Sequence, residues 1–297
     1  MPKPIPAPRE EGFTTTTETP LYWVTYGQVG APRLLVLHGG PGADHQYLLP
    51  QMLHLGEKFD LLFYDQRGGG KSRSDVRAPV TWRTHVEDLD GVTREFSLDP
   101  LSIVGYSWGA MLGLLYTIEQ RRNPHLLAPF RMALINPAPL TTEYRRQFES
   151  EFARRQASPE IQKLRDELAA SGLRERDSEA YRQRAFELGV AGYFSDPRKA
   201  TDLTPFRVVG RIQQSVWDSL GDFDLIRNLK GIRIPSIIIS GRDDPIPLAS
   251  SSEAARALET NFVVLDECGH VPYVEQPSKL FAALDPFLDE TNPPVRS

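Results

Sequence analysis

The stretch of sequence that decides the fold is Gly105-Tyr106-Ser107-Trp108-Gly109, a glycine-x-serine-x-glycine pattern. An apolar, partly β-branched run precedes it at residues 101–104, and an apolar, mostly helix-forming run follows at residues 110–116. A serine on a sharp strand-to-helix turn has a strained backbone, and small residues two positions away on each side allow the turn to close. The pattern therefore predicts that the Ser107 hydroxyl stands clear of a sheet, with the Trp108 N–H at a helix N-terminus.

A serine nucleophile needs a histidine to take its proton and a carboxylate to orient that histidine. His270 is the strongest base candidate because it follows the last predicted strand. Asp243 and Asp244 both follow the predicted strand at residues 235–240, so position alone leaves either as the acid. Asp65 also ends a strand, but the neighbouring Arg67 and glycines indicate a structural ion pair in a turn.

The second half of an oxyanion hole is predicted from the glycine-rich loop at residues 39–42. Only glycine lets a backbone N–H approach a substrate oxygen without a side chain in the way. The amides of Gly39, Gly40 and Trp108 are therefore the candidate oxyanion donors. His38 lies so close to this loop that a role in shaping it is favoured.

Short apolar strands alternate with helical patterns, which is typical of a parallel sheet covered on both faces. The strands are expected at residues 21–26, 33–37, 59–64, 101–104, 131–135, 235–240 and 261–265, and the helices at residues 81–96, 110–116 and 280–288. The sequence thus predicts an α/β fold with a mostly parallel, doubly wound sheet.

The chain divides into a core and an insertion. We expect a flexible arm at residues 1–12, a core at residues 13–139 and 221–290, a helical cap at residues 140–220, and a loose tail at residues 291–297. The insertion leaves the core at a strand end and returns before the strand that precedes the acid, so it must lie on the active-site face.

Bulk composition narrows the function. The 297 residues are 40% hydrophobic and 25% charged with a net charge of −5, so the chain has no basic surplus for nucleic acid. The N-terminus has no apolar signal region and no run is long enough to cross a bilayer, which predicts a cytoplasmic protein without membrane contact. No histidine pair has metal-site spacing, and residues 65–72 lack the first glycine of a P-loop. We therefore expect no metal and no cofactor, a small-molecule or short-peptide substrate as the partner, and predict no oligomeric state.

Taken together, the chain resembles the α/β-hydrolase superfamily over nearly its whole length, and within it the proline iminopeptidase group. The matching residues are His38-Gly39-Gly40-Pro41-Gly42, Asp65-Gln66-Arg67-Gly68-x-Gly70-x-Ser72, Gly105-x-Ser107-Trp108-Gly109, Gly241-Arg242-x-Asp244-x-x-Pro247 and Gly269-His270. In this pattern the acid is the fourth residue of the Gly-x-x-Asp motif. The resemblance therefore selects Asp244 over Asp243 and implies a catalytic set of Ser107, Asp244 and His270.

One stretch departs from the group. Iminopeptidases of this type hold the substrate's amino group with cap glutamates, one of them just before an aromatic pair. Here the similar stretch, residues 190–194, ends in Tyr193-Phe194 and contains no acid. The resemblance implies substrate binding by Tyr193, Phe194 and Trp217, and Glu187 is one helical turn away from the expected acid.

These observations predict a serine hydrolase that acts on a small ester or amide through an acyl-enzyme. Because the expected acid is missing, esterase activity should exceed iminopeptidase activity. Other enzymes open on the same reasoning are a carboxylesterase, a lactonase or a C–C bond hydrolase. The alternatives are a true proline iminopeptidase and, from another class, a non-catalytic receptor that uses the same pocket for a small ligand.

Overall fold

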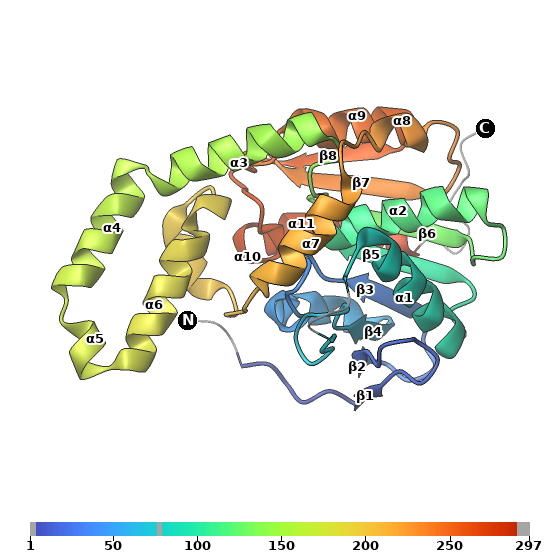
Figure 1. The fold of residues 1–297 in the computed structure, drawn as a ribbon, viewed down its shortest axis with the longest axis horizontal. Coiled ribbons are helices and arrows are strands. Elements are labelled where there is room, and N and C mark those ends of the chain that lie inside the picture. Colours follow the sequence, from blue (N-terminus) through green and yellow to red (C-terminus); the bar gives the residue numbers. More distant parts are fainter. Residues whose placement is uncertain (1–3, 76–78, 290–297) are drawn as a thin grey trace.

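The computed structural model describes residues 4–75 and 79–289, and its centre is an eight-stranded sheet (Figure 1). The strand order is β1-β2-β4-β3-β5-β6-β7-β8; β2 pairs antiparallel with both β1 and β4, and the other neighbours pair parallel. The strands are β1 (Glu10–Phe13), β2 (Tyr22–Gly27), β3 (Arg33–Leu37), β4 (Asp60–Tyr64), β5 (Leu101–Tyr106), β6 (Pro129–Ile135), β7 (Ser236–Gly241) and β8 (Asn261–Leu265). The predicted mostly parallel α/β sheet is confirmed.

Alternate residues of the central strands enter two separate apolar clusters, one on each face of the sheet. In β3, Leu35 and Leu37 belong to one cluster while Leu34 and Val36 belong to the other. The first cluster is completed by α1 (Trp82–Glu95), α2 (Trp108–Arg122), α8 (Ile226–Leu229) and α9 (Leu248–Leu258). The second is completed by α11 (Pro277–Asp289) and the 3-10 helices η1 (Gln46–Leu48) and η2 (Gln51–Glu57). Both faces are buried, which is why the strands read as continuous apolar runs.

The N-terminal prediction is wrong at one point. Residues 10–12 were expected in a flexible arm, but they belong to the edge strand β1, whose register places Glu10 opposite Thr25. Before the strand, Arg9 forms an ion pair with Asp60 at 2.6 Å. Backbone pairing and this ion pair hold the segment in place. Neither leaves an apolar pattern in the sequence, so the strand was not predicted. The predicted tail at residues 291–297 lies outside the described residues.

Between β6 and β7 the chain forms a helical segment, residues 142–220. It contains α3 (Thr142–Gln156), α4 (Pro159–Ala170), α5 (Leu173–Arg176), α6 (Ser178–Val190), α7 (Gly210–Leu220) and the 3-10 helices η3 (Ala191–Tyr193) and η4 (Pro197–Asp202). In Figure 1, α4, α5 and α6 project beyond the sheet while α7 crosses back in front of it.

The helical segment contacts loops that follow the carboxyl ends of three strands. Val209 N–H donates to the Gly42 carbonyl after β3, and Ile212 packs against Gly68 after β4. The Tyr193 carbonyl accepts from His270 N–H after β8 at 2.7 Å. Across the described ranges, no helix combines the length and apolarity needed to cross a membrane.

Candidate active site

Ser107 lies at the turn between β5 and α2 with φ 53° and ψ −118°. The flanking glycines explain how the turn closes. A Cβ on Gly105 would lie 2.6 Å from the Ala110 Cα, and one on Gly109 would lie 2.2 Å from the Leu37 carbonyl oxygen. No side chain fits at either position, so the motif's spacing follows from packing of the helix start against β3 and β5.

A continuous chain of hydrogen bonds joins three of the predicted residues. His270 Nε2 lies 2.9 Å from Ser107 Oγ, and His270 Nδ1 lies 2.8 Å from Asp244 Oδ2. The carboxylate acceptor at Nδ1 favours the tautomer that carries its proton there, which leaves Nε2 to accept the serine proton. Both the His270 and Asp244 side chains are almost fully buried, at 7% and 4% exposed, so water competes weakly for these bonds.

Asn136 positions the Asp244 carboxylate, which in turn bonds His270. In the sequence, only its place at the end of a predicted strand indicated a role for it. Its Nδ2 donates to Asp244 Oδ2 at 2.6 Å and to the Gly269 carbonyl at 3.0 Å. Its Oδ1 accepts from Gly241 N–H at 3.2 Å. The second Asp244 oxygen accepts from Ile246 N–H at 2.8 Å. Together these contacts orient Asp244 toward His270.

The two rival acids lie elsewhere. The Asp243 carboxylate accepts from the Ser195 hydroxyl at 2.9 Å. Asp65 was expected to pair with Arg67, which is wrong: its carboxylate bonds His45 Nδ1 at 2.7 Å, and Arg67 pairs with Asp88. Asp65 also accepts the Lys71 N–H, so it is a turn residue as expected, with a different partner.

The glycine loop after β3 lies beside Ser107, since a Cβ on Gly39 would be 2.8 Å from the Ser107 Cβ. The Gly39 N–H was predicted to be an oxyanion donor, but it already donates to the Tyr47 hydroxyl at 2.6 Å. Trp108 is the first residue of α2, and its N–H has no acceptor within the helix. Gly40, with φ 62°, remains the candidate donor from the loop.

Gln66 hydrogen-bonds both Trp108 and the residue that precedes the glycine loop. Its amide oxygen accepts from the Trp108 indole at 2.8 Å and its Nε2 donates to the His38 carbonyl at 2.8 Å. Burial lowers the pKa of His38 to about 4, so its ring is neutral at pH 7. His38 Nδ1 lies 2.8 Å from the Gly39 carbonyl. His38 and Gln66 therefore support the loop, and both motif residues are structural.

An aromatic cluster from the helical segment covers His270. The Tyr193 ring lies 5.2 Å from the His270 ring and 4.4 Å from the Phe152 ring, with Phe148 at 6.2 Å on the same tyrosine. Trp217, on α7, lies 5.7 Å from the ring of Trp108. The Tyr193 cluster therefore gives the candidate site an apolar wall beside His270.

The other two predicted substrate contacts, Phe194 and Glu187, pack against or bond other groups. Phe194 is 2% exposed and packs in the apolar cluster of the second sheet face, which leaves its ring no surface for a substrate. Glu187 faces a cavity of about 940 Å³ between α6 and the residues around Phe206. Its carboxylate is paired with Arg184 at 2.7 Å and with Gln183 at 3.1 Å. The Phe206 ring in this cavity lies 4.4 Å from that of Tyr47.

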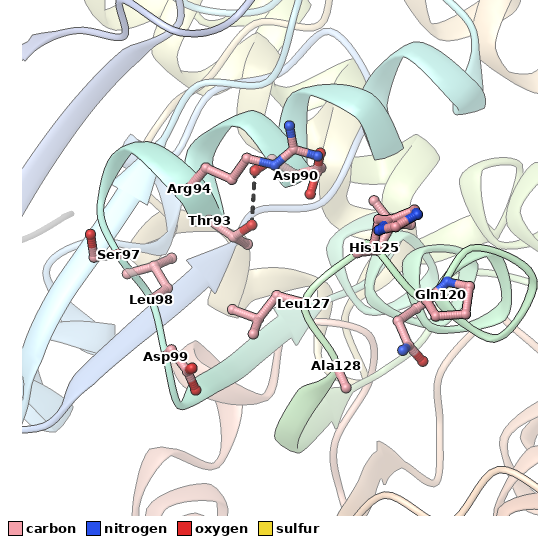
Figure 2. Close-up of a pocket in the computed structure, with 12 residues that line it drawn as sticks. Asp90, Thr93, Arg94, Ser97, Leu98, Asp99, Gln120, His125, Leu127 and Ala128 are labelled. Atoms are coloured by element: carbon pink, nitrogen blue, oxygen red, sulfur yellow. Dashed lines mark hydrogen bonds and ion pairs between the residues drawn. The ribbon is translucent and has the colours of Figure 1, made fainter.

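A separate cavity of about 440 Å³ lies at the opposite edge of the sheet (Figure 2). It is lined by Asp90 and Arg94 of α1, by Leu98 before β5, and by His125 and Leu127 before β6. Ser107 follows the carboxyl end of β5, whereas Leu98 precedes its amino end. This cavity is therefore separate from the candidate active site.

Comparison with known proteins identifies the class. Residues 34–284 match the alpha/beta hydrolase family, so the chain belongs to that family. It is 25% identical to a proline iminopeptidase of Clostridium botulinum over 95% of this chain and 99% of that protein. The chain is thus a hydrolase similar to the proline iminopeptidase-like group, as its motifs predicted.

Two solved structures share the fold. A proline iminopeptidase-related protein from Thermus thermophilus has a TM-score of 0.71 at 22% identity, covering 94% of this chain and 96% of that one. An enol-lactonase from Burkholderia xenovorans has a TM-score of 0.65 at 20% identity, covering 94% and 100%. At these identities the likeness establishes the fold alone.

Proposed function

We propose that this chain is a serine hydrolase that cleaves a small ester or amide through an acyl-enzyme. The observation that carries the proposal is the hydrogen-bonded chain from Ser107 through His270 to Asp244. It supplies a nucleophile, a base and an orienting carboxylate in the order that the chemistry needs. Trp108 and Gly40 are the proposed oxyanion donors, because Trp108 directly follows Ser107 and Gly40 follows Gly39, where a Cβ would lie 2.8 Å from the Ser107 Cβ.

In the proposed reaction Ser107 Oγ attacks the substrate carbonyl carbon while His270 Nε2 takes its proton. The tetrahedral oxyanion accepts hydrogen bonds from the two amides, and the leaving group departs with the proton from His270. A water molecule then attacks the acyl carbon, His270 takes and returns its proton, and the acid is released. Asp244 orients His270 and stabilises the imidazolium.

We further infer that the helical segment is a cap that sets specificity, and that it favours neutral acyl groups. The Tyr193 ring lies 5.2 Å from the His270 ring, and the Trp217 ring lies 5.7 Å from the Trp108 ring. Glu187, one helical turn before residues 190–194, is already paired with Arg184 at 2.7 Å. An ammonium group buried without a free counter-charge costs several kcal/mol.

A true proline iminopeptidase is the second candidate. Its support is the similarity to a protein of that name over 95% of this chain, together with the position of Glu187 at a cavity. Turnover of short-chain aryl esters against prolyl arylamides separates the two candidates.

A fluorophosphonate probe tests the serine chemistry itself. The wild-type protein should be modified at Ser107 and at no other residue, and Ser107→Ala should remain unmodified. The exposed Ser171→Ala variant is the matched control and should be labelled like the wild type. An unlabelled wild-type protein would overturn the proposal.

A further inference from the structure

Glu275, the last residue of α10 (Pro272–Glu275), joins the loop of the proposed base to the helical segment. Its side chain is buried, with the residue 5% exposed. One carboxylate oxygen accepts from Gly269 N–H at 2.7 Å and the other accepts from Ser195 N–H at 2.8 Å. Gly269 directly precedes His270, so a single carboxylate binds two stretches that are far apart in sequence.

The two stretches are in close contact around this carboxylate. His270 N–H donates to the Tyr193 carbonyl at 2.7 Å. A Cβ on Gly269 would lie 2.2 Å from that same carbonyl oxygen, so the loop has no room to shift toward the helical segment. The Gly269 carbonyl in turn accepts from Asn136, which also holds Asp244. A displacement of Gly269 would therefore disturb the contact with Tyr193 and, through Asn136, the position of Asp244.

We propose that Glu275 is a positioning residue, which through Gly269 holds His270 between Ser107 and Asp244 and through Ser195 holds the Tyr193 ring over His270. The inference rests on the proposed function, because it needs His270 as the base. Displacing a reacting group by about 1 Å can cost roughly 100-fold in rate. Loss of this carboxylate should act on turnover rather than only on stability.

The charge of Glu275 matters because the groups that hydrogen-bond its carboxylate, Gly269 and Ser195 among them, are backbone N–H donors. An ionised carboxylate accepts both N–H groups, whereas a protonated acid turns one oxygen into a donor and loses a partner. The Asp196 backbone N–H also donates to this carboxylate, and Lys199, which donates to the Glu275 carbonyl at 3.2 Å, is the nearby positive charge. The Cys268 thiol interacts with the charge of Glu275 and also with those of Asp243 and Asp244. Burial raises the pKa of Glu275 to about 7, so the exchange takes place near neutral pH.

Activity and stability then respond to pH in opposite directions. Turnover needs the ionised carboxylate, so it should fall as the pH drops through about 7. Because this pKa is raised in the folded state, the folded protein binds more protons than the unfolded chain between about 4.5 and about 7. The contribution of Glu275 to the free energy of unfolding therefore grows as the pH falls, and unfolding does not explain the loss of turnover.

The test is a pH profile of kcat/KM on a short-chain aryl ester for the wild type, Glu275→Gln and Glu267→Gln, with circular dichroism as the check on folding. Protonation of His270 abolishes turnover, whereas protonation of Glu275 should lower it only to the level of Glu275→Gln. The wild-type profile should therefore be steeper than a slope of one over the range just below pH about 7 and then return to one, whereas Glu275→Gln should keep a slope of one throughout. Glu275→Gln should lose roughly 10-fold to 100-fold in kcat. Glu267 is exposed in the same loop, so its variant should match the wild type.

A wild-type slope that never exceeds one, with Glu275→Gln within about threefold of the wild type, would overturn this inference while fluorophosphonate labelling of Ser107 still supports the proposed function. Failure of the wild type to label would overturn both. The wild-type slope also decides the matter if Glu275→Gln does not fold, since it needs no variant.

Discussion

The backbone of Ser107, at φ 53° and ψ −118°, lies in a region that costs residues other than glycine about 1–3 kcal/mol. Ser107→Gly relieves this cost and Ser107→Ala does not, although both remove the hydroxyl. We expect both variants to lose turnover, and Ser107→Gly to be the more stable of the two by about 1 kcal/mol after the larger unfolded-state entropy of glycine. Urea unfolding of both variants measures the difference, and equal stability would show that the turn is unstrained.

Asp243 and Asp244 are adjacent in sequence but have different partners. Asp244 binds His270 Nδ1, whereas Asp243 binds the Ser195 hydroxyl. Asp244→Asn places an amide where a carboxylate orients the imidazole, so we expect a loss of about 10⁴-fold in kcat. Asp243→Asn keeps the size of its side chain and should cost little. Steady-state kinetics of the pair give the answer, and the reverse order would move the acid to Asp243.

The elements that the sequence predicted well are those with apolar runs. Residues 33–37 and 261–265 were expected as strands and form β3 and β8 with those limits, because burial on one or both faces leaves a pattern in the sequence. The strand β1 left no such pattern, since three of its four residues are exposed and its pairing uses backbone groups. Pairing of that kind is invisible to an analysis of periodicity.

The residues of the candidate site divide in the same way, into those that a sequence pattern reveals and those that it does not. Ser107, Asp244 and His270 stand at motif positions that local spacing and resemblance reveal. Asn136 was missed because its partner Asp244 is 108 residues away, and Glu275 because its partner Ser195 is 80 residues away; neither has a motif of its own. The role of such residues depends on the contact itself, which appears only when the strands and the helical segment are assembled.

Within the helical segment, η3 presents Tyr193 to His270. Tyr193→Ala removes a ring that lies 4.4 Å from Phe152 and 5.2 Å from His270, and so opens the wall of the proposed substrate site. We expect KM for aryl esters to rise about 10-fold or more, with a smaller change in kcat, because the ring binds ground state and transition state alike. Tyr193→Phe keeps the ring and should behave as the wild type. A fall in kcat alone would place Tyr193 among the groups that position His270.

At the scale of the whole molecule, parallel strand order brings the site together. The carboxyl ends of β3, β5, β6, β7 and β8 lie at one edge of the sheet and are followed by the glycine loop, Ser107, Asn136, Asp244 and His270. Loops at this edge collect side chains from distant parts of a chain. The helical segment leaves and returns at the same edge, so both parts contribute residues to the proposed substrate site.

The charges of the helical segment bear on which substrate the assembled site takes. Glu187 is paired with Arg184, and Asp218 and Asp222 are exposed, with Asp218 bonded to Gln214. None of these acids offers a free, buried counter-charge for an ammonium group, which costs several kcal/mol to desolvate unpaired. We expect kcat/KM to be higher for short-chain aryl esters than for prolyl arylamides, and N-acetylation of a prolyl amide to leave its kcat/KM unchanged or raised. Glu187→Gln should not alter this order. A preference of more than about 10-fold for the free amine that disappears in Glu187→Gln would contradict this expectation. It would show that Glu187 binds the substrate's amino group and that the chain is an iminopeptidase. Each factor of ten in kcat/KM corresponds to about 1.4 kcal/mol of charge pairing.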